Sequence, residues 1–321
     1  MNQTKAVSRA AGSGGKAKAQ KEGLWFRIKR DRQLLLLLLP GLLFYAIFRY
    51  GPMFGLVIAF KKYSPFLGVA KSPWVGLENF TKFFSTNDFW LLFRNTLTIG
   101  VLSLAVTFPA TILFALLLNE VRHKFYKKLV QTVSYLPTFL SVVIVCSMTI
   151  DILSPNSGII NQILKLLGQD PIYFMTDPKY FRAIYVISGL WSGLGSGAII
   201  YLAALSGTDQ SLYEAARIDG CGRIRMMWSI TIPSIMPTII TMLILNSANV
   251  FRVGQDKILL LYNPMTYEVA DVFSTFVYRK AFVENNLSFS AAVGMFESVV
   301  CCLVLFVTNK VSEKATGESL W

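Results

Sequence analysis

The side chains best suited to contact a polar ligand lie inside apolar stretches of this 321-residue chain. They are two aromatic residues, two amides and one carboxylate: Trp191, Tyr201, Asn246, Asn249 and Glu297. Aromatic rings suit stacking on sugars, and amides suit hydrogen bonding to hydroxyl groups. Unpaired polar groups are costly in hydrocarbon, so polar residues at this depth mark either a solute path or a hydrogen bond between helices. We therefore expect the five to be candidates for a substrate path, with a structural hydrogen bond as the alternative for each.

No catalytic arrangement stands out elsewhere in the chain. The four cysteines show neither CxxC nor metal-ligand spacing, which predicts free thiols. The single histidine, His123, lies between Arg122 and Lys124, as expected of a basic loop. No Ser/His/Asp set, Walker loop or carboxylate pair is evident. We therefore expect that the chain is not an enzyme, has no catalytic residue and binds neither metal nor cofactor.

Composition indicates an integral membrane protein. Hydrophobic residues make up 54% of the chain, and the mean hydropathy is +0.51. Stretches of about 20 apolar residues cross a bilayer as helices. The first predicted span begins at Leu34, and the sequence leaves its end open as far as Phe60. The other five are Asn95–Leu118, Leu129–Ile150, Ala183–Leu205, Ile235–Phe251 and Phe289–Val307. The predicted fold class is an all-α membrane protein with six transmembrane helices.

Charge placement predicts the orientation. Residues 1–33 hold nine Lys or Arg and two acidic residues, and residues 119–128 hold four Lys or Arg and one acidic residue. The positive-inside rule then places the N-terminus, the 119–128 loop and the 206–234 loop in the cytoplasm. The net charge of +13 is explained by topology and attraction to membrane lipid, so no nucleic-acid partner is expected.

Two regions are expected. Residues 1–32 are rich in Ala, Gly, Ser and Lys and should form a disordered, basic cytoplasmic tail. No small-residue cleavage site follows the first apolar stretch closely, so that stretch is interpreted as a retained span. Residues 33–321 should form the transmembrane domain, with the polar loop at about 206–234 lying between two spans.

That loop contains a polar, hinged segment, residues 214–233. Asp209 can cap a short helix, Gly220 permits a sharp turn, and a second helix can begin at Arg223. The order of residue types resembles the signature loop of binding-protein-dependent ABC transporter permeases, with the pattern E-A-A-x3-G-x9-I-x-L-P. The matching residues are Glu214, Ala215, Ala216, Gly220, Ile230 and Pro233. Only Ile232 departs, because it replaces a leucine; the alternative is a solvated loop helix with a glycine stop.

The resemblance implies a type I importer with several subunits. This chain would pair with a second, homologous permease, two ATPase subunits and an extracytoplasmic solute-binding protein in a bacterial cell membrane. ATP and magnesium would bind the ATPases. The residues implied in coupling to the ATPase are Glu214, Ala215, Ala216, Asp219, Gly220, Ile230 and Pro233.

Further segments resemble the carbohydrate branch of these permeases, in particular the branch that handles oligosaccharides and polysaccharide fragments. They include residues 59–65, 74–80, 94–97, 262–264 and 292–296. The implied function is a transmembrane subunit of an ATP-driven oligosaccharide importer. An importer permease for another solute is the closest alternative. An ion-coupled secondary transporter should carry several intramembrane carboxylates, and a membrane scaffold or lipid enzyme should carry a soluble domain or a catalytic set.

Two patterns predict packing. Asn79–Phe93 is rich in aromatic residues and should lie along the outer membrane interface, where it anchors the chain or contacts the binding protein. Gly189, Gly193 and Gly197 recur every four residues and should allow close helix packing, either within the subunit or against the partner permease.

Overall fold

The computed structural model describes residue 29, residues 31–317 and residue 319. The chain divides into two compact units, Met1–Gly55 and Leu56–Trp321. The elements in the described ranges are helices, with one isolated antiparallel bridge between Lys61 and Trp74. The all-α prediction is therefore confirmed. The predicted disordered tail, residues 1–32, lies almost entirely outside the described residues.

The first unit is one long apolar helix. It contains α2 (Arg32–Tyr45), the π-helix η1 (Ala46–Tyr50) and α3 (Gly51–Met53). Helical backbone continues through η2 (Phe54–Phe60), so the candidate span is Arg32–Phe60 and the longer version of the first predicted span is correct. Its length and apolar composition suit a helix that crosses a membrane.

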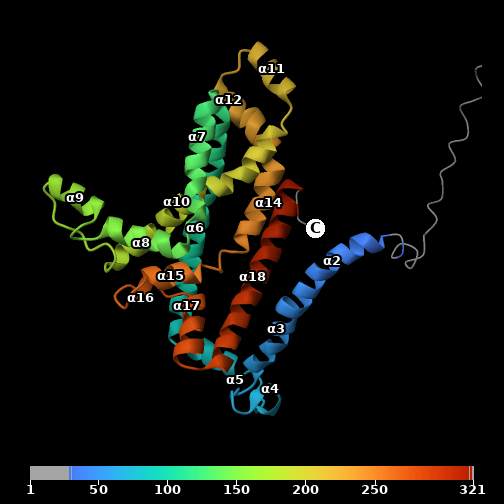
Figure 1. Ribbon diagram of the computed structural model, residues 1–321, viewed down its shortest axis with the longest axis vertical. Helices are drawn as coiled ribbons and strands as arrows, with labels where there is room; N and C mark the ends of the chain where they lie inside the picture. The colour runs from blue at the N-terminus through green and yellow to red at the C-terminus, as the bar shows by residue number, and fades with distance from the viewer. Residues whose placement is uncertain (1–28, 30, 318, 320–321) are drawn as a thin grey trace, which may run out of the picture. The chain divides into compact units, whose positions relative to one another are not determined.

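The second unit is built from three long helices and several shorter ones. The long helices are α6 (Asp88–Glu120), α10 (Pro178–Ser206) and α18 (Leu287–Thr316). The shorter ones up to α10 are α4 (Gly68–Lys71), α5 (Glu78–Ser85), α7 (Lys124–Tyr135), η3 (Leu136–Phe139), α8 (Val142–Leu153) and α9 (Ile159–Leu166). Those after it are α11 (Gln210–Ile218), α12 (Arg223–Met226), η4 (Met227–Thr231), α13 (Ile232–Ser234), α14 (Met236–Ser247), α15 (Gln255–Leu261), α16 (Tyr267–Ala270), α17 (Phe273–Tyr278) and η5 (Arg279–Val283). Figure 1 shows α11 and α12 at one end of this unit and α5 and α17 at the opposite end.

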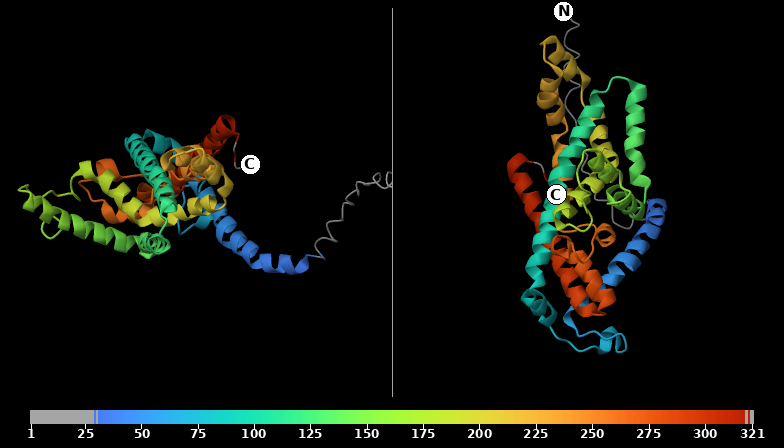
Figure 2. Two further views of the ribbon diagram at one scale, coloured as in Figure 1. Left: turned by 90° about the horizontal axis from the view of Figure 1, so that it is seen from above. Right: turned by 90° about the vertical axis from the view of Figure 1, so that its left-hand side faces the viewer.

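Four helices in the described part of the chain are long and apolar enough to cross a membrane, and six spans result if each of two bent pairs counts as one. The predicted span Leu129–Ile150 corresponds to one of the bent pairs, because the helix turns by 102° between Phe139 and Val142. Leu140 and Ser141 leave the helical region, and the Ser141 hydroxyl accepts from the Ile144 N–H to start α8. As a result, α8 and α9 project to one side (Figures 1 and 2).

The fifth predicted span, Ile235–Phe251, has the wrong ends. The helix stops at Ser247, and it is preceded by Arg223–Ser234 with a bend of 65°. Pro233 and Pro237 flank Ile235, whose backbone leaves the regular helical angles. Proline cannot donate a backbone hydrogen bond, so two prolines in this position favour a break rather than a continuous helix.

The glycine pattern of α10 packs differently from the prediction based on Gly189, Gly193 and Gly197. A Cβ on Gly197 would lie 2.9 Å from a threonine methyl of α6, but one on Gly193 would meet nothing within 4 Å. The tight contact is at Gly195, where a Cβ would overlap the backbone carbonyl of Ser134 in α7. Close packing within this chain therefore holds at Gly197, fails at Gly193, and is strictest at a glycine outside the pattern.

We expect Gly195→Ala to lower stability by about 1–3 kcal/mol, because a methyl group would force α10 away from the α7 backbone. Gly193→Ala adds the same methyl to open space and is the matched control. Thermal unfolding of the purified proteins in detergent measures both. Equal unfolding temperatures for the two variants would show that the α7–α10 contact does not constrain residue 195.

Aromatic rings join the ends of α5, α6, α17 and α18. Phe83 is fully buried, and its ring centroid lies 6.0 Å from that of Phe273 and 5.5 Å from that of Phe296. The segment predicted to lie at the interface, Asn79–Phe93, is divided between α5, which ends at Ser85, and α6, which begins at Asp88. Burial of Phe83 against rings from distant segments explains the aromatic content of this stretch.

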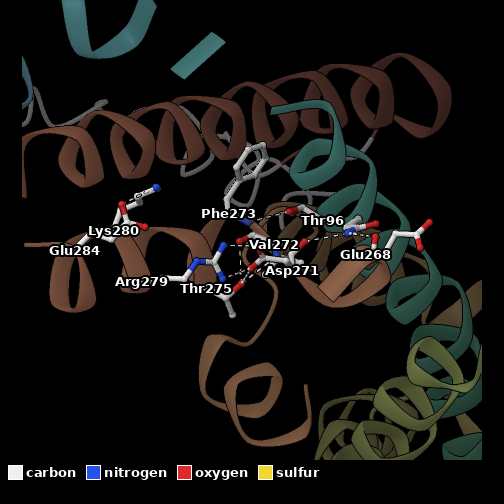
Figure 3. Close-up of polar contacts among 10 residues, drawn as sticks. Thr96, Glu268, Asp271, Val272, Phe273, Thr275, Arg279, Lys280 and Glu284 are labelled. Carbon is white, nitrogen blue, oxygen red and sulfur yellow. Dashed lines mark hydrogen bonds and ion pairs between the residues drawn. The ribbon is translucent and has the colours of Figure 1, made fainter. Parts of the chain in front are cut away.

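A polar junction lies beside that aromatic cluster (Figure 3). The buried carboxylate of Asp271 forms an ion pair with Arg279 at 2.5 Å and accepts from the Thr275 hydroxyl at 2.7 Å. The Thr96 hydroxyl of α6 accepts from the Phe273 N–H at 3.2 Å. These bonds hold the start of α17 against α6 while satisfying polar groups that water does not reach.

Arg279→Met should cost about 3–5 kcal/mol of stability, because it leaves the Asp271 carboxylate buried without its counter-charge. Lys280→Met is the matched control: Lys280 pairs with Glu284 at 2.7 Å, and the glutamate side chain is 44% exposed. Exposed pairs contribute about 0–1 kcal/mol. Chemical or thermal unfolding in detergent distinguishes the two, and similar losses would contradict a special role for the Asp271 pair.

Candidate functional site

The loop that carries the signature begins with a capped helix. The Asp209 carboxylate accepts from the Ser211 N–H at 2.9 Å and thereby starts α11. The Ser211 backbone N–H, together with its hydroxyl, lowers the pKa of Asp209, so the cap is ionised at neutral pH. The expected cap is therefore present, and it fixes the first residue of the helix that carries Glu214, Ala215 and Ala216.

The glycine break follows the geometry expected from the sequence. Gly220 has φ +73°, and the Cys221 N–H donates to the Ala216 carbonyl at 2.8 Å. This left-handed termination satisfies a carbonyl at the end of α11 and reverses the chain. A second helix, α12, begins at Arg223, as predicted.

The surface of this loop is unusually apolar for a segment between spans. Glu214, Ala215, Asp219 and Gly220 are exposed, and Ala216 is half-buried. We call the exposed apolar side chains around them the apolar tip: Leu212, Ile218, Ile224 and Trp228. Ile218 is 87% exposed in this chain. An exposed apolar cluster of this kind is typical of a surface that contacts another protein or a membrane.

The other end of the signature leads back into the membrane domain. Ile230 is half-buried in η4, and Pro233 lies in α13, just before α14. The Tyr213 hydroxyl of α11 donates to the Thr231 hydroxyl of η4 at 3.0 Å, and Thr231 is almost fully buried. This hydrogen bond ties α11 to the segment that leads to α14. Neither Tyr213 nor Thr231 was singled out in the sequence.

The two loops predicted to share one side of the membrane lie next to each other. Asn119 and Arg122 line a polar hollow of about 470 Å³ together with Gln210, Arg217 and Arg223. The C-terminal ends of α6 and α10 thus meet at the 206–234 loop, which we call the coupling loop after the role implied by its resemblance. This arrangement agrees with the charge pattern, which assigned the 119–128 and 206–234 loops to the same compartment.

A cavity of about 390 Å³ lies between α6, α10, α14 and α15. Tyr201 and Asn246, two of the predicted path residues, line it. Tyr185 and Lys257 also line it, and neither was predicted as a path residue. Lys257 lies beyond the predicted spans. The glycine pattern of α10 forms part of the wall: Gly189, Gly193 and Gly197 all face this space. Glycine there leaves room for a solute.

A second hollow, of about 150 Å³, adjoins the first. The two share Ser103, Thr107, Tyr185 and Asn246, and the second adds Asn249 and Arg252. Three of the five predicted path residues are therefore brought together: Tyr201, Asn246 and Asn249. Their polar atoms and the threonine and serine hydroxyls supply donors and acceptors for a hydroxylated solute.

The remaining two predicted path residues lie elsewhere. Trp191 lines a separate, apolar groove of about 480 Å³ between α8, α9 and α10. Glu297 lines neither of the polar hollows and is half-buried in α18, where it is attracted electrostatically to Arg252. Within a single chain, the structure therefore groups neither residue with Tyr201, Asn246 and Asn249.

The family described as "Binding-protein-dependent transport system inner membrane component" matches residues 107–316, which include α10, the coupling loop and α14. The chain belongs to this family. Its membrane location as an inner membrane component and the family suggested by the signature loop are therefore confirmed.

Relatives and solved structures agree with the assignment. The chain is 45% identical over 294 residues to "Protein LplB" of Bacillus subtilis, covering 92% of both chains. It is 40% identical over 304 residues to the B. subtilis "Polygalacturonan/rhamnogalacturonan transport system permease protein YteP", covering 95% of both. A structure of "a bacterial ABC transporter involved in the import of the acidic polysaccharide alginate" matches with a TM-score of 0.85 and 41% identity, covering 92% of this chain and all of the other. A bacterial alginate ABC transporter in complex with an alginate pentasaccharide-bound periplasmic protein also matches with a TM-score of 0.85.

Glu297 should tolerate glutamine better than leucine. An amide retains most hydrogen bonds of the carboxyl group, and such intramembrane bonds contribute about 0.6–2 kcal/mol, whereas leucine removes them. We expect Glu297→Gln to support substantial uptake and Glu297→Leu to support less at equal expression. Solute uptake by cells carrying the complete transporter measures this. Loss of uptake in Glu297→Gln alone would instead indicate that the negative charge is required.

Proposed function

We propose that this chain is a permease subunit of an ATP-driven importer for oligosaccharides. The observation that carries the proposal is the combination of an exposed, capped coupling helix with a polar cavity in the same compact unit. One feature suits docking to a motor subunit, and the other suits passage of a polar solute. Family membership and the names of the relatives support the same conclusion.

The chain itself serves as the path and the coupling device, and ATP with magnesium is bound by two separate ATPase subunits. Movement of an ATPase would displace α11, the Tyr213–Thr231 hydrogen bond would pass the displacement to η4, and the break at Ile235 would let α14 tilt. Because Asn246 lies on α14 and lines the cavity, such a tilt changes the shape of the path. Alternating access follows from this linkage.

Three kinds of partner complete the assembly: the ATPases, a second permease and a solute-binding protein. The second, homologous permease covers the open side of the path, and the extracytoplasmic solute-binding protein delivers the sugar; one solved relative is a complex with such a periplasmic protein. The N-terminus and the coupling loop face the cytoplasm, in line with the basic residues of the 119–128 loop. The length and apolar composition of Arg32–Phe60 suit a span in contact with lipid or the partner permease.

We expect substitutions in the coupling loop to uncouple transport without preventing assembly. Ala216→Phe should hold α11 away from its partner, Gly220→Val should strain a backbone that needs positive φ, and Glu214→Lys should reverse a charge offered to the ATPase. Each should lower binding-protein-stimulated ATP hydrolysis and solute uptake about tenfold, the loss that corresponds to about 1.4 kcal/mol of coupling energy. Both quantities are measured on the complex reconstituted in proteoliposomes.

Gly168→Val is the matched control for Gly220→Val. Gly168 also has positive φ, at +76°, and also has open space around its Cβ, but it lies after α9 and away from the coupling loop. The control should suffer the same local strain and retain coupling. Wild-type hydrolysis and uptake in all three coupling variants would contradict the proposed role of the loop, and uptake of a solute other than an oligosaccharide would identify a different importer.

A further inference from the structure

Two cationic side chains line the joined hollows, and none of the described carboxylates lines either one. Lys257 lines the larger hollow and Arg252 the smaller, and the two spaces share Tyr185 and Asn246. The other lining residues are hydroxyl, amide, glycine and apolar residues. A positive charge held away from bulk water is costly unless an opposite charge compensates it. An excess of cations along a solute path therefore favours binding of an anionic solute.

Lys257 is held in place by neutral groups. Its ammonium group donates to the Tyr185 carbonyl at 2.7 Å and lies 4.6 Å from the centroid of the Tyr185 ring. Across the described ranges, no Asp or Glu oxygen lies within 4.0 Å of the Lys257 nitrogen. An ammonium group has three donors, and the carbonyl uses one. The charge is thus positioned beside the cavity with donors left for a ligand.

The glycine residues of α10 keep the Lys257 ammonium group accessible from the cavity. A Cβ built on Gly189 would lie 3.0 Å from the Lys257 nitrogen, so glycine at this position lets the ammonium group reach the cavity wall. At Gly193, the next residue of the same pattern, a Cβ would have no neighbour within 4 Å. The glycine pattern that does not serve close packing at residue 193 instead leaves open space in the cavity that Lys257 also lines.

Arg252 supplies a second, differently shaped donor. Its side chain lines the smaller hollow with Asn246 and Asn249, and a guanidinium fork matches both oxygens of a carboxylate. Its charge is partly balanced by attraction to Glu297 of α18. Lys257 has no described carboxylate within ion-pair distance, so Lys257 should contribute more to binding of an anion.

We propose that Lys257 and Arg252 bind the carboxylate groups of an acidic, uronate-containing oligosaccharide as it crosses the membrane. The inference rests on the proposed importer function and adds the chemical class of its substrate. Tyr201, Asn246 and Asn249 contact the sugar rings and hydroxyls, while the two cations bind the negative charges. Carboxylates spaced along a sugar chain suit two cations in adjoining hollows, because one ligand can then reach both.

The test compares labelled trigalacturonate with its methyl ester, which keeps the rings and loses the charge. Binding to the solubilised permease–ATPase complex is measured by equilibrium dialysis without the binding protein, whose own specificity then plays no part. Wild type should bind the acid at least tenfold more tightly than the ester, since a charge-assisted hydrogen bond is about twice as strong as a neutral one. Lys257→Gln should weaken acid binding about tenfold and Arg252→Gln about threefold, while both variants bind the ester as wild type does.

Two control variants separate charge from general damage. Lys257→Arg keeps the charge and should retain acid binding, and Lys165→Gln makes the same neutralising change at an exposed residue of α9 that lines neither hollow. Equal wild-type binding of acid and ester, no binding of either, or unchanged acid binding in Lys257→Gln would overturn this inference. Uptake of neutral oligosaccharides by the complete transporter would still support the proposed function in that case, whereas failure to import any oligosaccharide would overturn both.

Discussion

Hydrocarbon offers no hydrogen-bond partners, and this constraint governs the placement of polar groups in the membrane domain. Hydrocarbon favours backbone groups that are satisfied within helices, and polar side chains that are hydrogen-bonded or line a hollow. The Asp271–Arg279 pair and its hydroxyl partner illustrate the first solution. The cavity lined by Tyr201, Asn246 and Lys257 illustrates the second.

The breaks in the helices follow from that constraint as well. A helix that stops within the domain exposes unpaired N–H groups and carbonyls, so each break needs a local remedy. The Ser141 hydroxyl provides it at the start of α8. The break at Ile235 has a further consequence, because it lies between the coupling loop and the helix that carries Asn246.

The proposed coupling route between the surface and the cavity is short. The apolar tip is exposed, α11 is bonded to η4 through Tyr213 and Thr231, and η4 leads to α14. Rigid packing of α6 along α10 gives α14 a fixed surface to move against, and this combination of rigid and hinged parts suits two-state gating.

The helical class, the family and the details of the coupling loop were all determined by the sequence itself, whereas contacts between distant residues were decided by tertiary structure. Apolar length predicts spans, and the Asp209 cap and the Gly220 turn depend on neighbours close in sequence, so all were predictable locally. The 102° turn near Ser141, the burial of Phe83 against distant rings, and the tight contact at Gly195 were mispredicted or missed. A search within apolar spans could not find Lys257, because it lies outside them. Its charge reaches the cavity wall only when α15 folds against α10. Local patterns specify helices and turns, whereas a cavity is specified by which surfaces of those helices meet.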